Sequence, residues 1–377
     1  MISVGIIAEF NPFHKGHARM VNKIREAFAK SHPHETVAVV TVMSGNFVQR
    51  GELACLPKGY RAEAAIRCGF DLALELPYPY SSACAEKFAE AGVFLLARLG
   101  VDYIAFGSET GEIGYLERAA ERLSQPEFEK ALGDRIAADK SRPYAEIRDG
   151  VYADLYGELP PASPNDILGV AYLTAMKKYG KGLKTLAIKR EGNESATASR
   201  GAYHDGNRKR LEYLVPKDSL EIIAKCKPVS VKILEKTVLA FLRLTPFEAL
   251  EGIADMPVGL APRLCEAAKK CNTLEEFFEA VATKSYTNAR IRRVLLFCLF
   301  GVEKNRFDSM PAFTRLLGAS EVGRRFLQGV NFPVLTRKGD HRLYGEEVRE
   351  QVAFADRADG VYALADENPP VNKPFIL

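Results

Sequence analysis

The first 190 residues alternate short apolar runs with amphipathic helical patterns. Five of the apolar runs are rich in valine, isoleucine and leucine and lack strict polar alternation, as expected for strands covered on both faces. The predicted strands are residues 3–8, 36–43, 71–76, 101–106 and 183–189. Helical stripes, such as those at 17–30 and 82–99, lie between them and predict a doubly wound parallel α/β sheet. Such sheets bind ligands at the carboxyl ends of their strands, so the loops that follow the strands are the places to search.

From about residue 216 the pattern changes to helices without convincing strands. Prolines punctuate this part, and helical stripes fall at residues 230–243, 246–254, 274–282 and 288–300. We therefore predict an α/β catalytic domain at residues 1–215, followed by a mainly helical domain at residues 216–377.

The composition indicates a soluble protein without a structural metal. No segment reaches about 18 uninterrupted apolar residues, which argues against a membrane span. The N-terminus lacks the basic region of a signal peptide, so we expect a cytoplasmic protein. The 7 cysteines are scattered singly with no CxxC pair, so we predict neither a disulfide framework nor a protein-bound metal. The oligomeric state is left open.

The net charge of +4 is unevenly distributed along the chain. Residues 1–160 carry 18 Lys/Arg against 22 Asp/Glu, a net of −4, which leaves +8 for the remainder. A basic second half is typical of a protein that meets a polyanion, although a solvated basic surface explains it equally well.

The first predicted strand leads into two histidines, His14 and His17, three residues apart at a predicted helix start. Residues with this spacing face the same region, where backbone N–H groups and the helix dipole favour an anion such as phosphate. Gly16 between them lets a nucleotide approach the backbone closely. Imidazole N–H groups there would stabilise charge growing on an α-phosphate, by roughly 3–4 kcal/mol each. The alternative is a surface or zinc-ligating pair, but the other histidines lie in no recognisable spacing with these two.

The His14-Lys15-Gly16-His17 segment resembles the HxGH signature of the nucleotidyltransferase superfamily, which has a HUP/Rossmann-like fold. The longer string over residues 5–17 is similar to the tRNA(Met) cytidine acetate ligases. This resemblance implies activation of acetate with ATP and Mg²⁺, then acetylation of N4 of the wobble cytidine of elongator tRNA(Met). It implies that His14 and His17 are catalytic and that the following residues bind ATP: Ile7, Phe10, Asn11, Pro12, Phe13, Gly16 and Met20.

Loops after the second and fourth predicted strands offer further binding residues. Ser44, Asn46 and Arg50 lie where a substrate loop belongs, and Arg50 suits a carboxylate or phosphate, although an ordinary polar turn is the alternative. Gly107 ends the fourth strand, and the resemblance gives Asn165 a nucleotide contact. Alternatively, Gly107 is an ordinary glycine between a strand and a turn, and Asn165 is a helix cap.

A second phosphate segment follows the fifth strand, about 180 residues after His14. The stretch from Ser195 to Arg200 resembles the family's Ser-Ala-Thr-x-Ile-Arg, a counterpart of the ISSTxxR motif. Ser199 departs from it, because an apolar residue usually stands there. Hydroxyls at a helix start and arginines suit the β- and γ-phosphates, which predicts ATP contacts from Arg190, Ser195, Thr197 and Arg200.

The second half contains a basic segment at residues 283–293. Lys284, Arg290 and Arg293 fall at roughly helical spacing, with Tyr286 available to stack on a base. Residues 284–350 hold 13 Lys/Arg against 7 Asp/Glu, which suits a tRNA backbone. A solvated helix face is the alternative.

Three functions fit these patterns. A tRNA(Met) cytidine acetate ligase uses both halves of the chain. A small-molecule adenylyltransferase or carboxylate–amine ligase explains the first 200 residues equally well but leaves the basic half without a role. A non-catalytic nucleotide- and RNA-binding protein would not need the intact His14, Gly16, His17 and Arg200. We favour the ligase.

Overall fold

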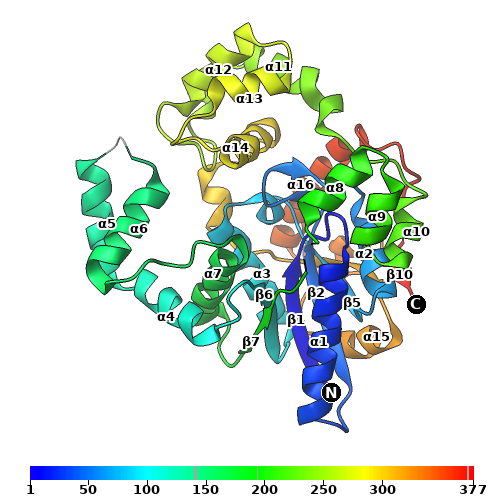
Figure 1. Ribbon diagram of the computed structural model, residues 1–377. Helices are drawn as coiled ribbons and strands as arrows, with labels where there is room; N and C mark the ends of the chain where they lie inside the picture. The colour runs from blue at the N-terminus through cyan, green and yellow to red at the C-terminus, as the bar shows by residue number, and fades with distance from the viewer. Residues whose placement is uncertain (140–141, 193, 372) are drawn as a thin grey trace.

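The computed structural model describes residues 1–139, 142–192, 194–371 and 373–377, which are organised around one mixed β-sheet (Figure 1). Its strands are β1 (Ile2–Ala8), β2 (Val37–Ser44), β5 (Leu72–Leu76), β6 (Tyr103–Ser108), β7 (Lys184–Lys189), β8 (Thr314–Ala319), β9 (Val334–Leu335) and β10 (Phe375–Ile376). They lie in the order β10-β8-β5-β2-β1-β6-β7, and β9 pairs with β8 beside this row. Within the row β5-β2-β1-β6-β7 all adjacent strands are parallel to each other, whereas β8 runs antiparallel to β5.

The five predicted strands are present as β1, β2, β5, β6 and β7, with ends within two residues of the prediction. Every residue of β2 is buried, which explains why its sequence shows no polar alternation. The predicted doubly wound parallel α/β core is therefore confirmed.

Helices cover both faces of these parallel strands. They are α1 (Lys15–Ser31), α2 (Lys58–Arg67), α3 (Ala85–Leu99), α4 (Ile113–Leu123) and α7 (Pro164–Tyr179). On one face, α3, α4 and α7 share a hydrophobic cluster with Ile7 and Leu74, and on the other, α1 and α2 pack with Val4 and Ile6. The strand order reverses beside β1, so the loops after β1 and β6 meet at the edge where such sheets bind ligands.

The other helices surround this core. They are α5 (Pro126–Ala138), α6 (Tyr144–Tyr156), α8 (Ala196–His204), α9 (Arg208–Leu214), α10 (Lys217–Ile223), α11 (Glu235–Leu244), α12 (Leu260–Lys270), α13 (Leu274–Val281), α14 (Asn288–Phe300), α15 (Glu321–Leu327) and α16 (Glu346–Ala363). In Figure 1, α5 and α6 project as a pair and α11 to α14 form a body above the sheet. The helices predicted at 274–282 and 288–300 are confirmed as α13 and α14.

Two expectations for the second half are wrong. Residues 246–254 form only a 3₁₀ turn at Phe247–Leu250, because the chain then bonds across to the segment after α14: Ala254 N–H donates to the Val302 carbonyl over 2.8 Å. The expected absence of strands also fails, because β8, β9 and β10 return to the sheet. The β8 sequence, with a glycine and a single β-branched residue, carries little of the β-branched enrichment that marks a strand.

The predicted boundary at 215/216 lies between α9 and α10, within one hydrophobic cluster that includes Leu211, Leu214, Val215 and Ile223. The division into two domains stays a prediction. None of the helices in the described ranges is both long and apolar enough to cross a membrane.

Candidate active site

The start of α1 carries both histidines at the carboxyl edge of β1. His14 is the N-cap of α1 and its Nδ1 accepts the Gly16 N–H over 3.1 Å. His17 reaches back, so that its Nδ1 accepts the His14 N–H over 3.1 Å. The two imidazoles thereby satisfy backbone donors that a helix start leaves without intrahelical partners.

These hydrogen bonds determine where each imidazole carries its proton. A neutral imidazole has one accepting and one donating nitrogen, so an accepting Nδ1 leaves the proton on Nε2. Burial, followed by the nearby Arg190, lowers the pKa of His14 to about 4. Burial, followed by the neighbouring His14, lowers the pKa of His17 well below its usual value. At neutral pH both rings are therefore uncharged Nε2–H donors.

Aromatic rings hold this pair in place. The His14 and His17 rings stack with centroids 3.7 Å apart, and the Phe10 and Phe13 rings lie 5.0 and 5.2 Å from the His17 ring. Phe10 and Phe13 belong to the buried cluster that joins α1 and α2 to the sheet. The hydrophobic core thus fixes the orientation of His17.

The second predicted phosphate segment lies beside the residues that precede α1. Ser195 caps α8 by accepting the Ala198 N–H over 3.1 Å. Arg200 Nη1 donates to the Asn11 carbonyl over 2.9 Å, and its Nη2 donates to Thr197 Oγ1 over 3.4 Å. Two segments nearly 190 residues apart are therefore hydrogen-bonded to each other.

Salt bridges join the loop before α8 to α1. Arg19 forms a bidentate pair with Glu194, and Lys23 pairs with Glu191 at 2.8 Å. The hydrogen bond from Arg19 lowers the pKa of Glu194 to about 2. Arg190 lies in this loop and has no hydrogen-bonded or ion-paired side-chain partner among the described residues. Its guanidinium is thus free to bind an anion.

The loop after β6 and the start of α7 form another wall. Asn165 donates its amide to the Glu109 carboxylate, whose other oxygen accepts the Asp166 N–H over 3.2 Å. Asp166 is buried and accepts from Ser163 Oγ over 2.6 Å. A Cβ at Gly107 would lie 3.4 Å from Arg190 Cγ, so a side chain at this position would contact Arg190.

These walls enclose a cleft of about 660 Å³ at the carboxyl edge of the sheet. The predicted site residues that line it are Ile7, Phe10, Asn11, His14, Gly16, His17, Met20, Arg50, Gly107, Asn165, Arg190, Ser195, Thr197 and Arg200. Lining residues that sequence reasoning missed include Glu9, Arg19, Lys23, Glu109, Tyr172 and Glu194. The predicted residues outside this lining are Pro12, Phe13, Ser44, Asn46, Lys284, Arg290 and Arg293. The cleft thus brings together the histidines, the phosphate segment and one arginine of the predicted substrate loop.

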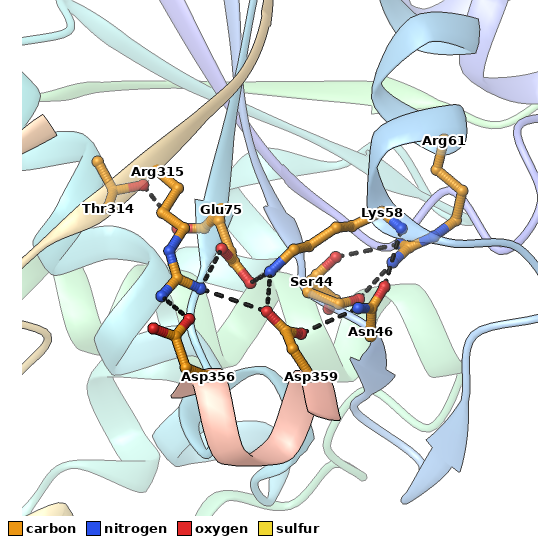
Figure 2. Close-up of polar contacts among 10 residues, drawn as sticks. Ser44, Asn46, Lys58, Arg61, Glu75, Thr314, Arg315, Asp356 and Asp359 are labelled. Carbon is orange, nitrogen blue, oxygen red and sulfur yellow. Dashed lines mark hydrogen bonds and ion pairs between the residues drawn. The ribbon is translucent and has the colours of Figure 1, made fainter. Parts of the chain in front are cut away.

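Ser44 and Asn46 belong instead to a buried polar network behind the cleft (Figure 2). Asn46 donates to Asp359 Oδ1 and accepts the Lys58 N–H, both over 2.9 Å. The fully buried Arg61 donates to the Ser44 carbonyl over 3.1 Å and also to the carbonyls of Glu9 and Gly45. Ser44 and Asn46 therefore support the cleft from behind, and of the three predicted loop residues only Arg50 is placed to reach a bound molecule.

The same network contains a buried ion cluster, visible at the centre of Figure 2. Glu75 pairs with Lys58 at 2.7 Å and with Arg315 at 3.4 Å, and Asp359 pairs with both cations. Arg315 also pairs with Asp356 at 2.6 Å. The cluster joins α2, β5, β8 and α16, so the returning C-terminal segment supports the loops of the cleft.

The basic residues predicted to meet tRNA lie at or near the start of α14, away from the cleft. Arg290 and Arg293 both pair with Asp255, at 3.0 and 2.8 Å. Lys284 is exposed and has no partner in the parts of the chain that the structure describes. Only Lys284 of the three has a charge that no carboxylate compensates.

A short hairpin connects this helical part with the cleft. It consists of β3 (Phe47–Val48) and β4 (Glu52–Leu53), and it carries Arg50. Gly51 has φ +72°, and a Cβ there would lie 2.3 Å from the Arg293 backbone nitrogen, so only glycine allows this approach. Glu52 pairs with Arg292 at 2.6 Å. The start of α14 thus packs directly on the loop that presents Arg50.

Known proteins resemble this chain in sequence and in structure. A family model described as HIGH Nucleotidyl Transferase matches residues 1–373. The tRNA(Met) cytidine acetate ligase of Syntrophotalea carbinolica is 34% identical over 87% of this chain and 82% of its own length, and that of Syntrophomonas wolfei is 33% identical over 99% and 97%. The crystal structure of Thermotoga maritima TmcAL bound with α-thio ATP covers 100% of both chains with a TM-score of 0.90 at 29% identity. The chain therefore belongs to the HIGH nucleotidyl transferase family and, within it, to the tRNA(Met) cytidine acetate ligases.

Proposed function

We propose that this protein uses ATP to activate acetate and then acetylates N4 of the wobble cytidine of elongator tRNA(Met). The observation that carries the proposal is the hydrogen bond of 2.9 Å from Arg200 to the Asn11 carbonyl. It joins the two motif segments, which line the same cleft. The names of the relatives support the acetate and tRNA substrates, and the α-thio ATP of the solved relative supports the nucleotide. Such a reaction belongs in the cytoplasm, where tRNA is found.

In the first step an acetate oxygen attacks the α-phosphorus of ATP. A P–O bond forms to acetate, the P–O bond to the leaving pyrophosphate breaks, and acetyl-adenylate results. The Nε2–H groups of His14 and His17 would donate to the α-phosphate oxygens as charge develops there. Arg190 and Arg200, with Ser195 and Thr197 at the start of α8, would hold the departing phosphates.

We expect Mg²⁺ to enter with the triphosphate. The described residues contain no group of three or more His, Cys, Asp or Glu side chains arranged to hold a metal. Mg²⁺ usually keeps several waters and binds through substrate phosphates with one or two carboxylates, so it needs no dedicated cage of side chains. The ion would neutralise charge on the phosphates, while the residues of this chain position them.

In the second step N4 of the cytidine attacks the acetyl carbonyl carbon and AMP leaves. No nucleophilic side chain is needed for either step, so positioning and electrostatics supply most of the rate.

Two measurements test the proposal. We expect acetate-dependent exchange of pyrophosphate into ATP, and ATP-dependent transfer of labelled acetate to unmodified elongator tRNA(Met). Exchange that ignores acetate but responds to another small molecule would support a small-molecule adenylyltransferase instead. Binding of ATP and tRNA without any turnover would indicate a non-catalytic protein.

A further inference from the structure

The transfer step requires a proton acceptor, and this inference rests on the proposed function. The exocyclic amine of cytosine is conjugated with the ring and is a weak nucleophile. As N4 bonds to the acetyl carbon, it must lose a proton to a group within hydrogen-bond reach. The residues that line the cleft restrict which group this can be.

The two histidines cannot serve. His14 and His17 each use Nδ1 to accept a backbone N–H, and each carries its proton on Nε2. Neither neutral ring has a free lone pair for a second proton unless the start of α1 loses a cap.

Most of the carboxylates in the cleft are also engaged. The lining contains Glu9, Glu52, Glu109, Glu191 and Glu194. Glu194 is paired with an arginine, Glu191 with a lysine and Glu52 with an arginine. Both oxygens of Glu109 accept hydrogen bonds from the start of α7.

Glu9 differs from the other four. It follows β1 directly, and its Oε1 accepts the Gln49 N–H over 2.7 Å, which fixes the carboxylate against the hairpin of β3 and β4. Within the described ranges, Oε2 has no hydrogen-bond partner and the carboxylate has no ion pair. Arg61 donates to the backbone carbonyl of Glu9, which holds the main chain at this point. Glu9 is therefore a positioned carboxylate with one oxygen available in the cleft.

We propose that Glu9 is the catalytic base of the transfer step. Its free oxygen accepts a hydrogen bond from the N4 amine of the target cytosine, as Asp and Glu side chains do when they contact cytosine in DNA. The bond from N4 to the acetyl carbon forms, the bond from that carbon to the AMP oxygen breaks, and the electron pair leaves with AMP. The N4 proton passes to Glu9 and from there to solvent.

The surroundings of Glu9 suit this role. Burial raises the pKa of Glu9, whereas the Gln49 N–H, Arg200 and Arg61 lower it and Glu52 raises it further. Tyr172 also lines the cleft, and burial, followed by the Glu9 charge, raises the pKa of its phenol. A carboxylate with a raised pKa is a stronger base.

The Glu9→Gln variant separates this role from a structural one, because glutamine can still accept the Gln49 N–H. The partly exposed Glu63 on α2, paired with Arg67, provides the matched control Glu63→Gln. Each protein is first assayed for acetate-dependent ATP–pyrophosphate exchange. Each is then loaded with acetyl-adenylate from ATP and acetate, and mixed with unmodified elongator tRNA(Met) in a single turnover from pH 5 to pH 9.

We expect E9Q to keep exchange within about threefold of wild type while transfer falls by roughly 10²–10⁴-fold. Transfer by the wild type should slow as pH falls through the pKa of Glu9, and this acidic limb should be missing in E9Q. The Glu9→Asp variant keeps the charge at a shorter reach, so its transfer rate should lie between wild type and E9Q, which tests the role even where E9Q folds poorly.

Equal losses in exchange and transfer, or an acidic limb that persists in E9Q, would overturn the assignment. Exchange by E9Q that recovers only at raised Mg²⁺ would show that Glu9 serves the nucleotide–metal complex instead. Wild-type protein without acetate-dependent exchange would refute the proposed function itself, a result that does not involve the variant.

Discussion

The imidazoles of His14 and His17 stack face to face, with ring centroids 3.7 Å apart and planes 24° from parallel. Each also accepts a backbone N–H at the start of α1, so neither ring can turn without removing a helix cap. The same contacts that begin the helix therefore fix both Nε2–H groups as donors. Each ring thus caps the helix through Nδ1 and offers Nε2–H for the proposed transition-state stabilisation.

Replacement of either histidine by alanine should remove one of these donors. We expect His14→Ala and His17→Ala each to lower the turnover of acetate-dependent exchange by about 10²–10³-fold, the usual effect of losing a preorganised donor. The exposed His34 provides a control, and His34→Ala should leave exchange unchanged. Thermal melts of all three variants separate lost capping from lost chemistry. Full exchange activity in a folded H17A protein would contradict the assigned role.

The depressed pKa of His14 should also make stability depend on pH. The pKa is about 4 in the folded protein against 6.5 for an ordinary histidine, so the unfolded chain binds more protons between these values. Stability should therefore fall as pH decreases from about 6.5 toward 4, and His14 should account for about 2 kcal/mol between pH 7 and pH 5.

The His14→Asn variant measures this contribution, because asparagine is also a good N-cap but does not titrate. Urea unfolding at pH 7 and pH 5 should show a smaller difference in the free energy of unfolding for H14N than for wild type. An identical difference in both proteins would mean that His14 is not held neutral by its surroundings.

Local sequence patterns predicted the parts of the site that depend on neighbouring residues. Strand β2 is buried on both faces, which explains its mostly apolar sequence. The cap residue Ser195 lies in the loop that follows the last predicted strand. His14 and Gly16 function within a single helical turn. Patterns of this kind extend over a few residues and are visible in one sequence.

Hydrogen bonds and ion pairs between residues far apart in the sequence were not predicted. Asn46 bonds to Asp359, 313 positions away, and nothing near either residue indicates the partner. The pairing of Arg293 with Asp255 likewise depends on how α14 folds back. Strand β8 was missed because its place beside β5 is set by tertiary packing rather than by its own residues.

The buried ion cluster behind the cleft should be costly to break. Glu75 is 2% exposed and pairs with Lys58 and Arg315, so Glu75→Gln leaves two cations with less compensation. We expect a loss of about 3–5 kcal/mol in the free energy of unfolding, as for other buried pairs that lose one partner. Urea denaturation measures it, with Glu266→Gln as the control, because Glu266 is 59% exposed and pairs with Lys269. A loss below about 1 kcal/mol would show that the cluster behaves as an exposed pair.

The basic residues at and before the start of α14 should separate into an RNA contact and a structural pair. Lys284 is exposed, so Lys284→Ala should weaken tRNA binding and reduce the slope of log K against log salt by about 1, with little change in stability.

Arg293 makes two hydrogen bonds to Asp255 and is 11% exposed. Arg293→Ala should therefore lower the free energy of unfolding by about 2 kcal/mol, because Arg290 still pairs with Asp255. Filter binding over a salt series and urea unfolding test both variants. The reverse result, an unchanged stability and a reduced salt slope for R293A, would place Arg293 on the RNA backbone in the complex.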